Sequence, residues 1–469
     1  MTPRFTEAEV VRATGGSLAR RGVSAAFEGI STDSRTIAPG SLFVALKGEH
    51  FDGHDFLSDA RAKGAGGAVV RRGAAALPET DGEWSLVEVD DTLVALGRLA
   101  RAHRSRFAVP IGAVAGSNGK TTTKEMAAAI LRTRGEALAT EGNLNNEVGV
   151  PLTLFRLTAS HRSAVVEMGM SKPGELGRVT AMTRPSAGVV TLVAEEHLEF
   201  LKDLDGVAAA EGELFRGLPP DAVAVVNLDD ARVVAEARKT RAKSRLTFGR
   251  AAGADVRLLS TERMGASAQR LVVGAGGEEF PVDLSFAGVH NAENATAAFA
   301  LATALGFGPE ACVQGLEAAR PFLHRSRIVE AGRILILDDC YNANPSSMAA
   351  ALRMLGSVAA RRRPVAVLGD MLELGAAEEA EHRALGARAV EAAALLVFFG
   401  PRSAAAFEAA RTAGPVTETA HFLEVEQLLA WLLPRLRERD AVLVKGSRGM
   451  KLERVVDALE ARKAGPGAS

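Results

Sequence analysis

Residues 108–133 read AVPIGAVAGSNGKTTTKEMAAAILRT, and the expected fold follows from this stretch. Its apolar first part predicts a buried strand, and the run after the glycines predicts a helix. Between them lie Gly116-Ser117-Asn118-Gly119-Lys120-Thr121. A glycine-rich turn that follows a strand and opens a helix is typical of a phosphate-binding loop. We therefore predict that residues 116–121, here called the phosphate loop, bind a nucleotide.

The residue types of the phosphate loop suit that chemistry. Glycine lets the backbone turn so that N–H groups point at phosphate oxygens, and the helix N-terminus adds positive partial charge. Lys120 can neutralise the β- and γ-phosphates, and the Thr121 hydroxyl can bind Mg²⁺. A strict motif has glycine at position 114, where this chain has Val114. The alternative is a surface loop that carries glycine and lysine by chance.

Before residue 108, short strand-like runs are mixed with turns, and from residue 108 on, strand-like runs alternate with helix-like runs. Strands are expected at 42–46, 164–168, 188–193, 222–230, 333–339, 364–370, 394–400 and 441–447, and helices at 346–355 and 377–394. This alternation indicates mostly parallel sheets covered by helices. Proline disfavours helix in the residue before it, so a boundary is placed at Arg320-Pro321. The expected fold is α/β with three domains: a mixed N-terminal domain (1–107), a central phosphate-loop domain (108–320) and a Rossmann-like C-terminal domain (321–469).

Composition narrows the class of protein. A chain of 469 residues, 47% hydrophobic and 24% charged, suits a globular protein of about three domains. A net charge of −1 gives no reason to expect a nucleic-acid partner, which needs an excess of basic residues. Two cysteines, Cys312 and Cys340, argue against a disulfide framework and favour a reducing compartment. No apolar run reaches about 18 residues, so no membrane span and a cytoplasmic location are expected.

Polar residues at predicted strand ends are candidates for a metal site. Glu167 ends one apolar run, and a carboxylate there can hold Mg²⁺ at the ligand-binding edge of a parallel sheet. His197 follows another run in the company of Glu195, Glu196 and Glu199. The alternatives are a solvent-facing acid for Glu167 and a structural histidine for His197.

A further polar segment begins at Asp338-Asp339. These acids end an apolar run and precede Cys340-Tyr341-Asn342-Ala343-Asn344-Pro345, whose asparagines and proline are typical of a loop. Asp339 could hold ribose hydroxyls. The alternative is a turn that caps the next helix, with Ser346 as the N-cap.

Taken together, these stretches resemble the Mur ligase family, which adds amino acids stepwise to UDP-N-acetylmuramic acid. The resemblance rests on 116–123, Glu167-Met168-Gly169, His197-Leu198-Glu199, His290-Asn291-Ala292-Glu293-Asn294 and 338–345, in the family's order and over most of the chain. Residues 140–151, 338–348 and 444–450 are most similar to the members that add D-alanyl-D-alanine to UDP-MurNAc-tripeptide. The tetrapeptide Asp-Asn-Pro-Arg, typical of members that add a diamino acid, does not occur.

The resemblance implies an activity and a set of site residues. It implies ATP and Mg²⁺ as cofactors, an acyl-phosphate intermediate, a role in peptidoglycan synthesis and a monomeric protein. The residues implied for ATP are Gly116, Ser117, Asn118, Gly119, Lys120, Thr121, Thr122, His290, Asn291, Asn294, Arg327 and Asp339, with Lys120, His197 and Arg327 as catalytic groups. Those implied for metal are Thr121, Glu167, His197 and Glu211. Those implied for the UDP-sugar, peptide and dipeptide are Ser31, Asp33, Ser34, Arg35, Asp52, Gly53, His54, Asn143, Asn145, Asn146, Tyr341, Asn342 and Asn344.

Three positions depart from the family pattern. Leu192 stands where members usually have asparagine, and Arg327 lies in Ser-Arg-Ile instead of Gly-Arg-Met. Glu211 stands where members often have a carbamylated lysine that helps to hold a second Mg²⁺. One hypothesis is that Glu211 replaces the carbamate without needing bicarbonate, and its rival is a weakened or absent second metal site.

These departures leave two other functions open. A sibling Mur ligase or a folylpolyglutamate-type ligase shares the central motifs, although the stretches at 31–35 and 52–54 favour a UDP-sugar acceptor. The changes at Leu192 and Glu211 also allow an ATP-binding regulator that no longer ligates.

Overall fold

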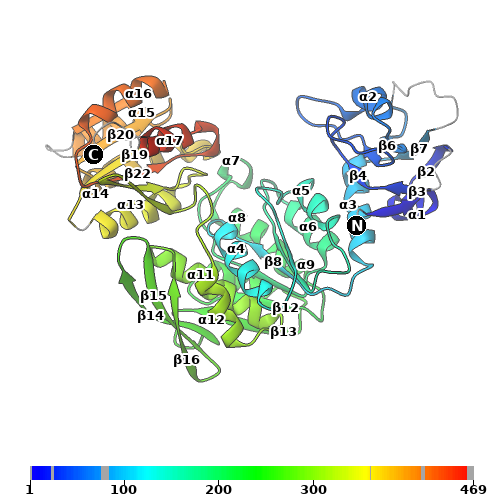
Figure 1. Ribbon diagram of the computed structural model, residues 1–469, viewed down its shortest axis with the longest axis horizontal. Helices are drawn as coiled ribbons and strands as arrows, with labels where there is room; N and C mark the ends of the chain where they lie inside the picture. Colours follow the sequence, from blue (N-terminus) through cyan, green and yellow to red (C-terminus); the bar gives the residue numbers. More distant parts are fainter. Residues whose placement is uncertain (1–2, 23–25, 75–83, 360, 414–417, 462–469) are drawn as a thin grey trace.

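The computed structural model describes residues 3–22, 26–74, 84–359, 361–413 and 418–461. Figure 1 shows three bodies in a row, with the N-terminal and C-terminal parts at opposite ends of a larger middle part. Each of the three large sheets lies within one predicted segment of the chain. The predicted α/β fold with mostly parallel sheets is thereby confirmed. None of the helices in the described ranges combines the length and apolarity that crossing a bilayer requires.

The N-terminal part holds a five-stranded sheet in the order β2-β7-β6-β5-β4, in which only β2 runs antiparallel to its neighbour. A second small sheet pairs β1 with β3. The elements are β1 (Arg4–Thr6), α1 (Glu7–Thr14), β2 (Ser17–Arg20), β3 (Ala26–Glu28), β4 (Ile30–Ser31), β5 (Leu42–Val44), η1 (Gly53–Phe56), α2 (Leu57–Ala62), β6 (Gly67–Arg71) and β7 (Ser85–Val89). The fully buried β5 lies within the predicted strand at 42–46.

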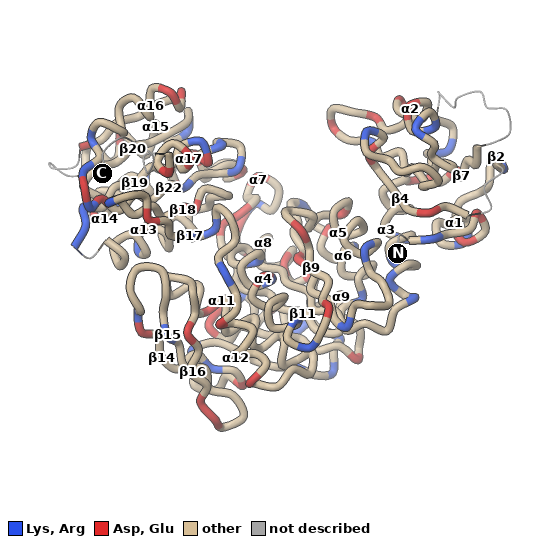
Figure 2. Tube along the Cα trace, in the orientation of Figure 1, with Lys and Arg blue, Asp and Glu red and all other residues tan. Residues whose placement is uncertain are grey.

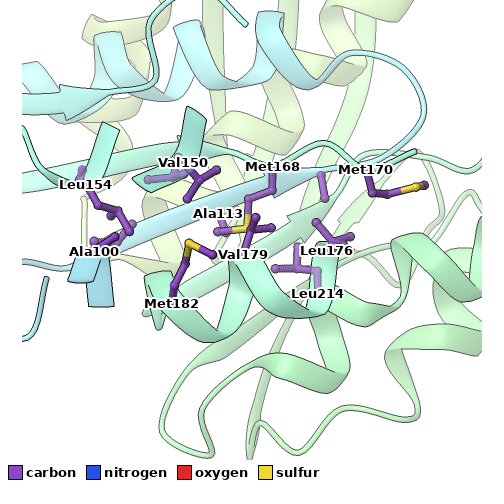
Figure 3. Close-up of a cluster of buried hydrophobic side chains, with 14 of the residues drawn as sticks. Ala100, Ala113, Val150, Leu154, Met168, Met170, Leu176, Val179, Met182 and Leu214 are labelled. Carbon is purple, nitrogen blue, oxygen red and sulfur yellow. The ribbon is translucent and has the colours of Figure 1, made fainter. Parts of the chain in front are cut away.

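Helix α3 (Thr92–Arg104) joins the N-terminal part to the middle part. Asp91 caps it by accepting hydrogen bonds from the N–H groups of Leu93 and Val94. The helix packs against α1 on one side and against α5 (Gly149–Leu154) and α6 (Glu175–Thr183) on the other. Figure 3 shows Ala100 of α3 among Leu154 and Met182 of the middle part. The two parts therefore share one hydrophobic core.

The middle part is built on a nine-stranded sheet in the order β16-β15-β14-β13-β12-β11-β8-β10-β9. Strands β8 to β14 are parallel, and β14, β15 and β16 form an antiparallel extension. Its strands are β8 (Ile111–Ala115), β9 (Ala137–Ala139), β10 (Ser163–Glu167), β11 (Ala187–Val190), β12 (Val223–Asn227), β13 (Ser244–Gly249), β14 (Val256–Met264), β15 (Ala268–Ala275) and β16 (Glu278–Leu284). Its further helices are α4 (Lys120–Arg132), α7 (Leu198–Leu201), α8 (Leu204–Glu211), α9 (Glu213–Gly217), α10 (Ala231–Ala237), α11 (Val289–Ala304) and α12 (Pro309–Ala318).

Burial explains why the central strands read as continuous apolar runs. Every residue of β8, β10 and β11 is buried, because helices cover both faces of the sheet. Gly112 of β8 lets α11 approach closely, since a Cβ there would lie 3.1 Å from a Leu301 side-chain carbon. The parallel order places the ends of β8, β10 and β11 at one edge of the sheet.

The C-terminal part has a six-stranded sheet in the order β17-β18-β22-β19-β20-β21, parallel except for β17. Its strands are β17 (Arg327–Ala331), β18 (Ile334–Asp338), β19 (Arg363–Gly369), β20 (Leu395–Phe399), β21 (Glu418–Phe422) and β22 (Asp440–Lys445). Its helices are α13 (Pro345–Ala359), η2 (Gly375–Ala377), α14 (Glu378–Ala392), α15 (Ala404–Ala413), α16 (Val425–Leu432), η3 (Leu433–Arg435), η4 (Arg448–Met450) and α17 (Glu453–Ala461).

The N-cap of α13 is Asn344, and not Ser346 as the alternative from the sequence had it. Asn344 accepts a hydrogen bond from the Ser347 N–H at 2.8 Å, and the Ser347 hydroxyl accepts one from the Asn344 N–H at 3.0 Å. Pro345 then occupies the first helical position, where its missing N–H costs nothing. The cap is therefore Asn344, two residues before Ser346.

Candidate active site

A cleft of about 930 Å³ lies between the middle and C-terminal parts. It opens at the carboxyl ends of β8, β10 and β11 on one side and of β18 and β22 on the other, the usual place for ligands in open α/β sheets. Figure 2 shows charged residues of both signs where the two parts face each other. The predicted residues that line it are Ser117, Asn118, Gly119, Lys120, Thr121, Thr122, Asn143, Asn145, Asn146, Glu167, His197, His290, Asn291, Asn294, Asp339, Tyr341, Asn342 and Asn344.

The phosphate loop lies between β8 and α4 and is held by close packing. Gly116 and Gly119 have φ values of +118° and +82°, which favour glycine. A Cβ at Gly116 would lie 2.2 Å from the Thr191 hydroxyl, and one at Gly119 would lie 2.1 Å from Asn294 Oδ1. The Thr191 hydroxyl also donates to the Asn118 carbonyl at 2.6 Å. Both glycines are therefore required by conformation and by space.

Lys120 is positioned to supply a positive charge. Its ammonium donates to the Gly116 carbonyl at 2.5 Å and lies 3.6 Å from Glu196 Oε2. Burial alone lowers the pKa of Lys120, but the carboxylates of Glu196, Glu211 and Glu167 raise it, and the net shift is upward. Lys120 is therefore protonated at neutral pH.

Three buried oxygen atoms at the loop fit a hard cation. Thr121 Oγ1, Glu167 Oε2 and Glu196 Oε1 have no hydrogen-bond partner among the described residues. Mg²⁺ prefers oxygen ligands, and buried oxygens without partners are costly unless a ligand meets them. Glu196 had been noted only as a neighbour of His197, and its place just after a strand end is the signal that could have selected it.

Glu211 and His197, both predicted metal ligands, are differently engaged. Glu211 Oε2 accepts a hydrogen bond from the Gly116 N–H at 2.7 Å, so it is not one of the unpartnered oxygens. His197 Nδ1 is hydrogen-bonded to Glu373 of the C-terminal part, and its Nε2 lies 3.9 Å from Glu196. The same hydrogen bond lowers the pKa of Glu373. His197 thus joins the two walls of the cleft.

Three of the residues implied for ATP, His290, Asn291 and Asn294, meet at the start of α11. His290 Nε2 lies 3.3 Å from the Ser326 hydroxyl, and burial lowers the pKa of its imidazole. Asn291 donates to the Ala287 carbonyl at 2.7 Å. Asn294 lies against Gly119, as described above, and donates to Asn291 at 3.3 Å. The histidine is left facing the cleft, while both asparagines also support the local backbone.

Asp339, predicted for the ribose, is held by a lysine that sequence reasoning missed. Lys445, buried at the end of β22, donates to Asp339 Oδ2 at 2.6 Å and to the Asn342 carbonyl at 2.9 Å. Asp339 Oδ1 accepts from the Ser326 N–H at 2.9 Å. Lys445 lies near the end of the strand predicted at 441–447, which is the signal that could have drawn attention to it.

Arg327 is implied for ATP and as a catalytic group, but the structure does not bring it into the cleft. Its guanidinium donates to Glu460 at 3.0 Å and lies 3.7 Å from Asp338. Arg325 lines the cleft instead, stacked 3.8 Å from the Tyr341 ring centre, and its buried Nε has no partner among the described residues. Positive φ angles at His324 and Ser326 turn the chain around Arg325. The side chains of Arg325 and Arg327 therefore point in different directions.

The remaining predicted residues of the cleft lie on both walls. Asn145 donates to Glu167 Oε1 at 2.9 Å. Asn146 accepts hydrogen bonds from the Val148 and Gly149 N–H groups, where the chain enters α5. Across the cleft, Asn344 donates to Asn118 Oδ1 at 3.0 Å. This amide pair directly connects the phosphate loop to the C-terminal part.

The predicted UDP-sugar residues lie in the N-terminal part and do not line the cleft. Arg35 pairs with Asp33 at 2.7 Å and lowers the pKa of that carboxyl to about 2. His54 is buried, with Nδ1 bonded to Asp52 at 2.6 Å and Nε2 accepting from the Arg71 N–H at 2.9 Å. Because both ring nitrogens are used, His54 supports its loop instead of offering a free group to a ligand.

The fold and cleft define an enzyme that handles a nucleoside triphosphate between two α/β domains. Family models match three parts of the chain: "Mur ligase family, catalytic domain" at 26–104, "Mur ligase middle domain" at 114–302 and "Mur ligase, glutamate ligase domain" at 324–448. The UDP-N-acetylmuramoyl-tripeptide–D-alanyl-D-alanine ligase of Escherichia coli (strain K12) is 38% identical over 94% of this chain and 95% of its own.

Solved structures agree with these matches. MurF from Acinetobacter baumannii superposes with a TM-score of 0.88 at 32% identity, over 98% of this chain and 99% of that one. MurF ligase from Thermotoga maritima in complex with ADP superposes with a TM-score of 0.81 at 27% identity, over 95% and 98% of the two chains. The chain belongs to the Mur ligase family. The predicted family and the predicted class, an ATP-dependent ligase, are confirmed.

Proposed function

We propose that this protein joins D-alanyl-D-alanine to UDP-MurNAc-tripeptide, using ATP to activate the acceptor as an acyl-phosphate. The observation that carries the proposal is the cleft, which sets Lys120 and the phosphate loop opposite Asp339 and Arg325 of the C-terminal part. The similarity to D-alanyl-D-alanine-adding relatives over nearly the whole chain supports the choice of substrates.

The chemistry proceeds in two steps. The terminal carboxylate of the acceptor attacks the γ-phosphorus of ATP, and ADP leaves. The amine of the dipeptide then attacks the acyl carbon, loses a proton, and inorganic phosphate departs. Two anions meet in the first step, so the charges of Lys120 and Arg325 and the N–H groups of the phosphate loop hold the phosphates and offset repulsion. Closure of the two walls keeps water from the acyl-phosphate.

Mg²⁺ fits the unpartnered oxygens of Thr121, Glu167 and Glu196 described above. When bound, it would neutralise charge on the phosphates and make the γ-phosphorus easier to attack. Asn145 would orient the Glu167 carboxylate through the hydrogen bond to its other oxygen. His197 would hold Glu196 and Glu373 in place on the two walls.

The loops at 31–35 and 52–54 are proposed to hold the UDP-sugar at the far end of the molecule. Lys63 donates to the Ser34 and Arg35 carbonyls, so the first loop is rigidly anchored. With the His54 ring engaged, backbone groups and the exposed Arg35 guanidinium are the groups available there.

Phosphate release by the purified protein tests the whole proposal. We expect release only when ATP, UDP-MurNAc-tripeptide and D-alanyl-D-alanine are all present, and none after EDTA removes divalent cations. Parallel reactions with D-glutamate, meso-diaminopimelate or a folate acceptor distinguish sibling ligases. Phosphate release that does not depend on the added acceptor and dipeptide would support a regulator or a simple ATPase.

The incoming dipeptide carries a carboxylate, for which the Tyr341 face of the cleft is proposed. Tyr341 lies between Arg325 and Arg448, whose guanidinium carbon is 5.4 Å from its ring centre. Arg448 is exposed, and its ionic partner Glu453 is 3.6 Å away. The Arg448 charge is therefore available to an anionic ligand.

Arg448→Ala is expected to raise the KM for D-alanyl-D-alanine by about 10-fold and to leave the KM for ATP nearly unchanged, because a charge-assisted hydrogen bond contributes about 1.5 kcal/mol or more. KM is measured for D-alanyl-D-alanine and for the same dipeptide with an amide in place of its C-terminal carboxylate. The wild-type protein should discriminate against the amide and the variant should not. Equal discrimination by both proteins would place the carboxylate elsewhere.

A further inference from the structure

Glu211 is a buried acid that has no role in the reaction described above. It ends α8, and only 2% of its surface is exposed. A buried carboxylate is costly unless it accepts hydrogen bonds or meets a cation. Its Oε2 accepts the Gly116 N–H at 2.7 Å. Burial raises the pKa of Glu211 well above its usual range, and the Lys120 charge opposes that shift.

The Gly116 amide is the first N–H of the phosphate loop. Ser117 is anchored to the Leu192 carbonyl through its N–H and to the Ala194 carbonyl through its hydroxyl. Asn118 is anchored through its carbonyl to Thr191. All of these partners are neutral. Among the described residues, Glu211 is the acid whose carboxyl accepts a backbone N–H of the phosphate loop. It binds the loop where the strand ends and the turn begins.

Hydrogen bonding distinguishes Glu211 from the candidate metal ligands, although its carboxyl lies beside that of Glu196. Thr121, Glu167 and Glu196 each present a buried oxygen without a partner, whereas Glu211 Oε2 is already satisfied by a backbone donor. Lys120 lies close to the same carboxylate and also bonds to the Gly116 carbonyl. The Glu211 carboxyl and the Lys120 ammonium therefore hydrogen-bond to the N–H and the C=O of Gly116, respectively.

We propose that Glu211 is a positioning residue: it holds the Gly116 N–H so that the phosphate loop keeps the shape that receives nucleotide phosphates. It acts through the loop and not as a metal ligand. The proposal rests on nucleotide binding at this loop, which belongs to the proposed function. The hypothesis that Glu211 replaces a metal-binding carbamate becomes the competing outcome of the test.

ADP affinity measured by calorimetry in EDTA tests the proposal, because no metal can contribute there. Glu211→Gln keeps an oxygen acceptor and should bind ADP within about threefold of the wild type. Glu211→Ala removes the acceptor and should weaken ADP by roughly 10-fold, the effect of about 1.4 kcal/mol. Glu211→Asp keeps the charge but is one methylene shorter, and should weaken ADP similarly. The aspartate variant also serves if the alanine variant does not fold.

Glu213→Ala is the matched control. Two residues further on, Glu213 accepts the Gly174 and Gly177 N–H groups at 2.6 and 2.8 Å, so it also holds backbone, but away from the phosphate loop. It should lower the melting temperature without changing ADP affinity. Melting temperatures of all variants report their folding.

Two results would overturn the proposal. The first is wild-type ADP affinity in EDTA for both Glu211→Ala and Glu211→Asp. The second is a Glu211→Gln variant with normal ADP affinity in EDTA but a Mg²⁺ requirement raised about 10-fold or more, which would assign Glu211 to the metal. If the wild-type protein itself does not bind ADP, the proposed function fails instead.

Discussion

Lys120→Ala is expected to reduce the turnover of ATP by at least about 1,000-fold, which corresponds to roughly 4 kcal/mol of lost transition-state stabilisation. The Lys120 ammonium sits at the phosphate loop, and three carboxylates keep it protonated. Phosphate release with both substrates present measures the effect. Turnover close to that of the wild type would refute the assignment of the phosphate loop.

Stability must be followed together with activity in this variant. Removing Lys120 leaves Glu196 and Glu211 buried without their nearest cation, which destabilises the loop. Lys120→Gln is a second variant that keeps a donor for the Gly116 carbonyl and lacks the charge. It should also be inactive. Lys243→Ala, an exposed position away from the cleft, should retain full activity and an unchanged melting temperature.

The two neighbouring arginines supply a second test with an internal control. Arg325→Ala is expected to lower kcat/KM for ATP by roughly 100-fold or more, because an arginine that offsets charge on a transferred phosphoryl group has effects of this size or larger. Arg325 lines the cleft and has a buried Nε without a partner in the described structure.

Arg327→Ala should stay within a few-fold of wild-type activity. It should lower the melting temperature instead, because Arg327 pairs with Glu460 and lies near the buried Asp338. Steady-state kinetics and thermal unfolding of the two variants decide the matter. If Arg327→Ala loses activity and Arg325→Ala keeps it, the arginine that acts on ATP is Arg327, as the sequence predicts.

Sequence reasoning worked where the chemistry is local. The phosphate loop is a strand, a turn and a helix within one short stretch, so its glycines and lysine can be recognised without tertiary information. Glu167 was selected because it ends an apolar run, and the parallel sheet brings that end to the loop. Alternating runs predicted the α/β segments of the middle and C-terminal parts for the same reason, since periodicity is a property of neighbouring residues.

The errors and omissions arose where partners are far apart in the chain. Asp339 and Lys445 are 106 residues apart, and Asn118 and Asn344 are 226 apart. No spacing rule connects such pairs. The structure places Arg325 and not the predicted Arg327 in the cleft, because left-handed residues at 324 and 326 turn the chain, and backbone angles of this kind are not visible in composition. His54 is predicted for the UDP-sugar, but its two ring nitrogens are bonded to Asp52 and to the N–H of Arg71, which lies 17 residues further along the chain.

Glu211 shows most clearly what each level contributes. By itself, the sequence determined the phosphate loop, the order of the α/β segments and the presence of an acid at position 211. Only the tertiary structure decided what that acid touches, because the fold must bring the end of α8 beside the turn after β8 before the Glu211 side chain can reach the Gly116 N–H. Local sequence specifies strands, turns and chemical groups. Which buried group meets which partner depends on packing between distant segments, where each hydrogen bond is satisfied by whatever the fold places beside it.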